Sequence, residues 1–84
     1  MKRAVNNLPS IVRIEDSSRI REIQFVPYEN KSMGDIIITF VKGDKRYKYF
    51  NVGREIFVQI VTAQSVGRAF DSLLKNQYQY ERLI

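Results

Sequence analysis

The alternation of apolar and polar residues predicts a first strand over residues 20–26. Ile23 and Phe25 occupy one face of this segment, and polar side chains occupy the other, which is typical of a half-buried strand. Pro27 ends it, because proline has no N–H to donate to the next strand. The polar and glycine-containing stretch that follows, residues 28–35, is expected to be a loop.

A hairpin is predicted next. Residues 36–41 are apolar on both faces and rich in β-branched side chains, which favours a central strand. Gly43 and Asp44 then suit a two-residue type II′ turn into a third strand over 46–51. The resulting register pairs Phe40 with Tyr47, Ile38 with Tyr49 and Ile36 with Asn51.

The two faces of the third strand differ in this register. Tyr47 and Tyr49 share the more apolar face, so burial in the core is the favoured interpretation of both rings. The alternative is that the rings are exposed and stack on nucleic-acid bases, as in single-strand binders. Arg46 and Lys48 lie on the opposite face with Phe50. A slip of one residue in the pairing would exchange the two faces.

Apolar residues at helical spacing predict two helices after the strands. The first is expected within residues 53–64. The second follows Ser65, a residue type that favours the N-cap position, and is expected to end at Asn76 in a left-handed conformation. The two apolar stripes are Ile56, Phe57, Ile60, Val61 and Ala63, and then Ala69, Phe70, Leu73 and Leu74.

These elements predict an α+β fold in which two helices cover one face of a three-stranded antiparallel meander, in a ββαα-type order. Residues 17–84 form the domain, with an extended tail from residue 77 onward. Residues 1–16 are an N-terminal arm. Within the arm, Ile11–Ile14 either add a strand to the sheet or stay loose.

Composition narrows the function classes. The chain has 84 residues and a formal net charge of +5, which favours an acidic partner. It contains no cysteine and no histidine, which removes disulfides, thiol nucleophiles and the commonest general base and transition-metal ligand. No apolar run has the length of a signal-peptide core or a membrane span, so a cytoplasmic protein with no membrane partner is expected.

Basic residues concentrate in the middle of the chain. Residues 17–52 hold seven Lys and Arg against four acidic residues. Lys42, Lys45, Arg46 and Lys48 fall on the predicted hairpin, where they either follow a phosphate backbone or protect a sheet edge against aggregation. The two interpretations have equal weight.

A weaker candidate for anion binding lies at the start of the second helix. Ser65, Gly67 and Arg68 place a helix N-terminus beside a cation, an arrangement that suits a phosphate. The commoner interpretation is that Ser65 only caps the helix and Gly67 only allows close packing.

Catalysis is the interpretation with the least support. The nine carboxylates show no recognisable acid–base or metal-binding spacing, and no nucleophile motif or Gly-rich phosphate loop is present. Neither a cofactor nor a metal is expected.

From Ser17 to Leu83 the chain resembles the KTSC domain, a short module found at the C-terminus of some lysyl-tRNA synthetases and as a free-standing bacterial or phage protein. The residues that carry the resemblance include Ser17, Ser18, the aromatic Tyr47-Lys48-Tyr49-Phe50 stretch, Val52, Phe57, Ser65-Val66-Gly67, Phe70 and Tyr78–Leu83. Gly53 stands where proline is expected, and the N-terminal arm lies outside the pattern.

The resemblance implies an α+β fold and RNA binding, and it implies structural roles for the motif residues Tyr47, Tyr49, Phe50, Ser65, Gly67, Phe70, Tyr78 and Tyr80. Together with the charge pattern, it predicts a non-catalytic module that binds RNA through Lys42, Lys45, Arg46, Lys48 and Arg68. The alternative is a protein-interaction module that docks through the tail Tyr78–Leu83 or the arm residues Ile11–Ile14.

Overall fold

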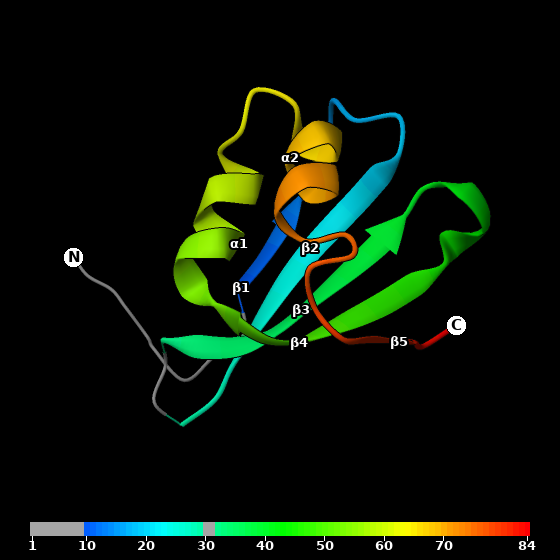
Figure 1. Cartoon of the computed structure of the whole chain (residues 1–84). Helices are drawn as coiled ribbons and strands as arrows, with labels where there is room; N and C mark the ends of the chain where they lie inside the picture. The colour runs from blue at the N-terminus through cyan, green and yellow to red at the C-terminus, as the bar shows by residue number, and fades with distance from the viewer. Residues whose placement is uncertain (1–9, 30–31) are drawn as a thin grey trace.

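The structure, a computed structural model, describes residues 10–29 and 32–84. These residues form a five-stranded antiparallel sheet in the order β1-β2-β3-β4-β5, with two helices over one of its faces (Figure 1). The strands are β1 (Ser10–Arg13), β2 (Ile20–Pro27), β3 (Met33–Phe40), β4 (Arg46–Gly53) and β5 (Tyr80–Arg82), and the helices are α1 (Arg54–Val61) and α2 (Val66–Leu73).

The predicted three-stranded meander is therefore wrong in strand number, although the α+β class holds. Strand β1 comes from the N-terminal arm and pairs with β2, and strand β5 comes from the tail and pairs with β4. Backbone hydrogen bonds hold the tail at the sheet edge, from Phe50 N–H to the Gln79 carbonyl and from Leu83 N–H to the Arg46 carbonyl. All three residues of β5 are exposed, so the weak alternation of the tail predicted an extended segment but not a strand of the sheet.

The core lies between the sheet and the helix layer. It contains Ile20, Ile23, Phe25, Ile36, Ile38, Tyr49 and Val52 from the strands, and Phe57, Ile60, Val66, Phe70 and Leu74 from the helical segment. Residues 1–9 lie outside the described part of the chain, so the core is given for the remainder. The helices thus bury the apolar face that the sheet alone would expose to water.

The connection between β3 and β4 differs from the predicted two-residue turn. The Phe40 N–H bonds the Lys45 carbonyl at 2.8 Å, so the chain reverses over residues 41–44. A short 3-10 helix fills this loop, and Gly43 and Asp44 both have positive φ angles, 73° and 51°. The longer loop moves the register by two residues, so that Ile38 lies opposite Tyr47 and Ile36 opposite Tyr49.

A shift of two residues leaves the side chains of Arg46 to Phe50 on their predicted faces, because side chains in a strand alternate with a period of two. Asn51, predicted opposite Ile36 on the apolar face, is instead exposed. Tyr49 is buried, and Tyr47 is half-buried against the same core. The expectation that both rings pack in the core with Phe40 and Ile38 is therefore confirmed.

A β-bulge in β4 places Tyr49 and Val52 on the same face although they are three residues apart. The pairing with β3 shifts between Gly34 and Ile36, and Asn51 takes the extra position with φ 59°. The Asn51 N–H donates to the Tyr28 hydroxyl at 3.0 Å, which fixes the bulge.

Two predicted helix signals are confirmed. Ser65 is the N-cap of α2, and its side-chain oxygen accepts a hydrogen bond from the Arg68 N–H at 3.3 Å. Asn76 has φ 65°, the left-handed conformation expected just after a helix. The cap fixes where α2 begins, and α2 in turn places Phe70 over the tyrosine face of β4.

Candidate functional site

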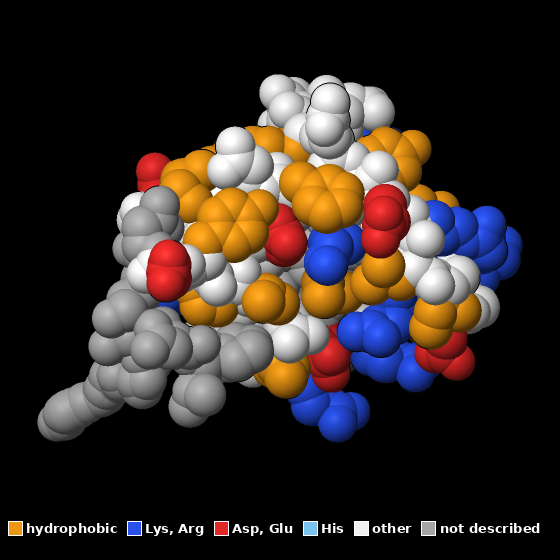
Figure 2. All heavy atoms as spheres, turned by 90° about the horizontal axis from the view of Figure 1, so that it is seen from below, with side chains coloured by type: hydrophobic (Ala, Val, Ile, Leu, Met, Phe, Trp, Pro, Cys, Tyr) orange, Lys and Arg blue, Asp and Glu red, His pale blue; other side chains and the backbone are white. Residues whose placement is uncertain are grey.

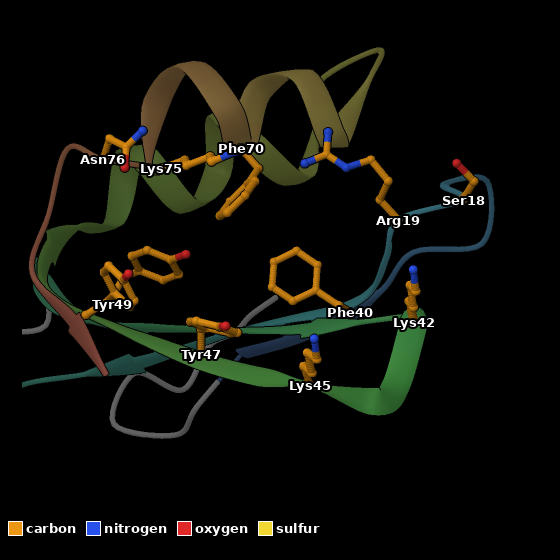
Figure 3. Close-up of a pocket in the computed structure, with 11 residues that line it drawn as sticks. Ser18, Arg19, Phe40, Lys42, Lys45, Tyr47, Tyr49, Phe70, Lys75 and Asn76 are labelled. Atoms are coloured by element: carbon orange, nitrogen blue, oxygen red, sulfur yellow. The ribbon is translucent and has the colours of Figure 1, made fainter. Parts of the chain in front are cut away.

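A cleft of about 530 Å³ lies between α2 and the β3–β4 hairpin, on the helix side of the sheet. In Figure 3, Phe40, Tyr47 and Tyr49 rise from the sheet and Phe70 faces them from α2. Arg19 and Lys42 lie at one end of the cleft, and Lys75 and Asn76 lie at the other. The cleft is thus formed by segments that are far apart in the sequence.

Five aromatic side chains line this cleft and contact one another in a closed ring. Neighbouring ring centroids are 5.8 Å apart for Phe40–Tyr47, 5.6 Å for Tyr47–Tyr80, 5.5 Å for Tyr80–Tyr49, 5.8 Å for Tyr49–Phe70 and 5.6 Å for Phe70–Phe40. These contacts are edge-on or tilted, which are favourable geometries for aromatic pairs. We call this set the aromatic ring cluster.

Tyr49 is the most buried tyrosine of the cluster, with 5% of its surface exposed. Burial, and to a smaller extent the neighbouring Tyr80 and Tyr47, raises the pKa of Tyr49 to about 12. Its hydroxyl is therefore protonated at neutral pH. Within residues 10–29 and 32–84, this hydroxyl forms no hydrogen bond.

Basic side chains line the mouth of the cleft. They are Arg19, Lys42, Lys45 and Lys75, and no acidic residue of the described chain lines it with them. Lys42 and Lys45 form no salt bridge with any described residue. The mouth therefore carries an excess of positive charge, which favours anions.

Arg19 is fixed differently from the lysines. Its Nη1 and Nη2 donate to the two carboxylate oxygens of Asp71 at 2.9 and 3.0 Å, and Nη1 also lies 3.4 Å from the Gly67 carbonyl oxygen. The hydrogen bonds with Arg19 lower the pKa of Asp71, and those with Asp71 raise the pKa of Arg19. This pair ties the start of β2 to α2 and holds one wall of the cleft in place.

A smaller hollow of about 280 Å³ adjoins the cleft, and Ser18 and Arg19 line both. Ser65, Gly67 and Arg68 line this second hollow, at the N-terminus of α2. The predicted anion site at this helix start therefore lies beside the cleft, although the Ser65 oxygen is already used as a cap.

The opposite face of the sheet carries the other predicted basic residues. Lys48 Nζ lies 4.0 Å from the Asp35 carboxylate and 5.8 Å from the centroid of the Phe50 ring. Arg46 lies two residues before Lys48 on β4 and therefore faces the same side of the sheet. Figure 2 views the molecule from this side and shows hydrophobic, basic and acidic side chains interspersed.

The structure therefore divides the predicted set of hairpin cations. Lys42 and Lys45 line the cleft, whereas Arg46 and Lys48 lie on the opposite face. The sequence contained one signal for this division, because Lys45 alternates in step with Tyr47 and Tyr49. Arg19 and Lys75 were missed, since nothing in the sequence places their distant segments at the cleft.

Tyr78, another residue of the predicted motif, lies outside the cleft. Tyr78 is half-buried and packs against the core. In the described part of the chain, no three Asp or Glu side chains are grouped as metal ligands would be. No helix between residues 10 and 84, leaving out residues 30–31, has the length and apolar character needed to cross a membrane.

Comparison with known proteins gives one consistent result. A family model described as the KTSC domain matches residues 16–78. The fold is similar to the crystal structure of a KTSC domain protein from Yersinia pestis, with a TM-score of 0.76 and 25% sequence identity, covering 92% of this chain and 100% of the other. No curated protein matches this chain in sequence.

Proposed function

We propose, from the premise that this chain belongs to the KTSC domain family, that it is a small non-catalytic module that binds single-stranded nucleic acid, with RNA as the preferred form. The observation that carries the proposal is a cleft that combines aromatic rings with a basic mouth. RNA is proposed over DNA because the resemblance to the KTSC family implies RNA binding.

The chemistry of the cleft matches that of a single strand. Phosphates need cations, and Lys42, Lys45, Arg19 and Lys75 line the mouth. Bases need flat apolar surfaces, and each base that stacks on an aromatic side chain contributes about 1–3 kcal/mol. A duplex keeps its bases stacked inside, so it presents only phosphates to such a cleft. A single strand is therefore the better ligand.

The second hollow extends the basic surface. Arg68 lines the second hollow together with Arg19, which also lines the cleft. A strand seated on Lys42 and Lys45 that continues past Arg19 reaches Arg68. This path accounts for three or four phosphate contacts without any base-specific group.

The side chains at the cleft are poorly suited to proton transfer at neutral pH. They are lysine, arginine, tyrosine, serine, asparagine and phenylalanine, and burial moves the pKa of Tyr49 further from neutrality, to about 12. This composition supports a binding role over a catalytic one.

The alternative, a protein-interaction module, has weaker support. The tail residues Tyr80–Arg82 are paired with β4, which uses backbone groups that a partner strand would need. Exposed large apolar side chains lie at both edges of the sheet, Ile11 on β1 and Tyr80, Leu83 and Ile84 in the tail, and at Tyr28, Val41 and Val58 elsewhere.

The test is a salt titration of binding, measured by fluorescence anisotropy. The ligands are a single-stranded RNA of about twelve nucleotides, a double-stranded DNA and an acidic polypeptide. Three or four phosphate contacts on a single strand predict a slope of about −2 to −3 for log affinity against log salt. Binding that is independent of salt, or equally tight to the acidic polypeptide, would contradict the proposal.

A further inference from the structure

We propose that the aromatic ring cluster is a pocket for a single nucleotide, in which the base enters the cluster, the Tyr49 hydroxyl bonds the base edge and Lys42 and Lys45 hold the phosphate. The inference rests on the proposed function and names the unit of the strand that the cleft binds. Three features of the cleft carry it.

The first feature is shape. Pockets for small organic ligands measure roughly 300–1,000 Å³, and the cleft, at about 530 Å³, falls inside this range. The five rings close on themselves instead of forming a row along the strand direction. A row would suit several successive bases, whereas a closed cluster suits one.

The second feature is the Tyr49 hydroxyl. Buried polar groups in proteins are nearly always hydrogen-bonded, and a lone exception points to a functional role. The side chain is 5% exposed and lines the cleft, and its hydroxyl has no partner within the described residues. Strand side chains stand roughly perpendicular to the sheet, so the hydroxyl is the part farthest from β4.

A purely apolar ligand would leave this hydroxyl without a partner. A nucleobase carries donors and acceptors along its edge and a flat face on each side. It can therefore satisfy Tyr49 while its faces lie against the neighbouring rings.

The third feature is charge. Clusters of aromatic rings elsewhere bind ammonium groups through cation–π attraction. A cationic ligand is disfavoured in this cleft, because Lys42, Lys45 and Lys75 line its mouth. Arg19 is already held by Asp71, which leaves the lysines of the mouth to take a phosphate, and Lys42 and Lys45 lie together on the hairpin. The ligand is thus planar and anionic.

The test uses three probes on the full chain: adenosine 5′-monophosphate, adenosine and ribose 5-phosphate. Binding is followed through backbone amide NMR shifts, with a competition against the labelled RNA strand. We expect the monophosphate to bind, to shift the amides of Tyr47, Tyr49 and Phe70, and to displace the strand. Each partial probe should bind at least about tenfold more weakly, since it lacks one of the two interactions.

Two variants localise the hydrogen bond. Tyr49→Phe keeps the ring and removes the hydroxyl, and should weaken monophosphate binding by about three- to tenfold, the loss of one hydrogen bond. Tyr78→Phe removes a hydroxyl outside the cleft and serves as the matched control, with affinity unchanged. Equal affinities for wild type and Tyr49→Phe would overturn the role of the hydroxyl.

The outcomes separate the two proposals. If the strand binds with the expected salt dependence but the monophosphate neither binds nor competes, the pocket is overturned and the proposed function stands. If the monophosphate binds at the cluster but no strand binds at about 50 mM salt, the pocket stands and the proposed function is overturned. Failure of both ligands overturns both.

Discussion

The two faces of strand β4 carry similar residue types in different surroundings. Lys45, Tyr47 and Tyr49 face the helix layer, where Phe40, Phe70 and Tyr80 complete a ring of aromatic contacts. Arg46, Lys48 and Phe50 face the other way, where an acidic neighbour, Asp35, approaches Lys48. Each face alternates basic and aromatic residues, so composition alone does not separate them.

The difference lies in what other elements add to each face. On the helix side, α2 closes over the tyrosines and distant segments supply Arg19 and Lys75, which makes a cleft with a basic mouth. On the open side, Lys48 lies over the Phe50 ring and near Asp35, so its charge is partly balanced and the ring partly covered. The comparison shows that a basic aromatic hairpin becomes a candidate site only on its enclosed face.

The largest effect should come from neighbouring isoleucines on opposite faces of β3. Ile38 is fully buried on the helix side, and Ile37 lies on the open side and is partly exposed. Ile38→Ala should lower the free energy of unfolding by about 2–5 kcal/mol, because it leaves a cavity in the core. Ile37→Ala, the matched control, should cost less than about 1 kcal/mol. Urea denaturation measures both, and equal losses would show that the faces are assigned wrongly.

A smaller effect is expected at the cap of α2, the helix that encloses one face only. Ser65→Ala removes the acceptor of the Arg68 N–H and should cost about 0.5–2 kcal/mol of stability. Ser72→Ala, on the exposed surface of the same helix, should change stability by less than about 0.5 kcal/mol. Thermal melts of the two variants test this, and a Ser65→Ala protein that melts like wild type would remove the cap from the account.

The sequence predicted the central strands and the two helices that cover them better than it predicted the edge strands β1 and β5. The faces of β4 came out correctly even though the turn did not, because the loop over residues 41–44 is longer by an even number of residues than the predicted turn. Strand β5 was predicted only as part of an extended tail, because its three residues are exposed. The Tyr80 ring contacts Tyr47 and Tyr49, and backbone hydrogen bonds pair the strand with β4. Pairing of that kind does not depend on side-chain type.

For the candidate site, the sequence predicted the residues that the hairpin contributes, but it did not predict those that come from distant segments of the chain. The alternation of Lys45 with Tyr47 and Tyr49 places them on one face. The contributions of Arg19 and Lys75 depend on how β2 and α2 meet, which is a property of the tertiary structure. The sequence predicts the four hairpin cations as one phosphate-binding set, and in the structure only Lys42 and Lys45 of that set line the cleft.

The central claim is that the enclosed face of the hairpin binds the strand and the open face does not. Its most direct test compares two double charge reversals, Lys42→Glu with Lys45→Glu and Arg46→Glu with Lys48→Glu, in the RNA binding assay. Both pairs change the net charge equally, so general electrostatic attraction falls by a similar amount in each. The account predicts a loss of at least about tenfold for the cleft pair, with a salt slope reduced by about 1.4, and a loss of less than about threefold for the open-face pair. An open-face loss equal to or larger than the cleft loss, in two folded variants, would contradict it.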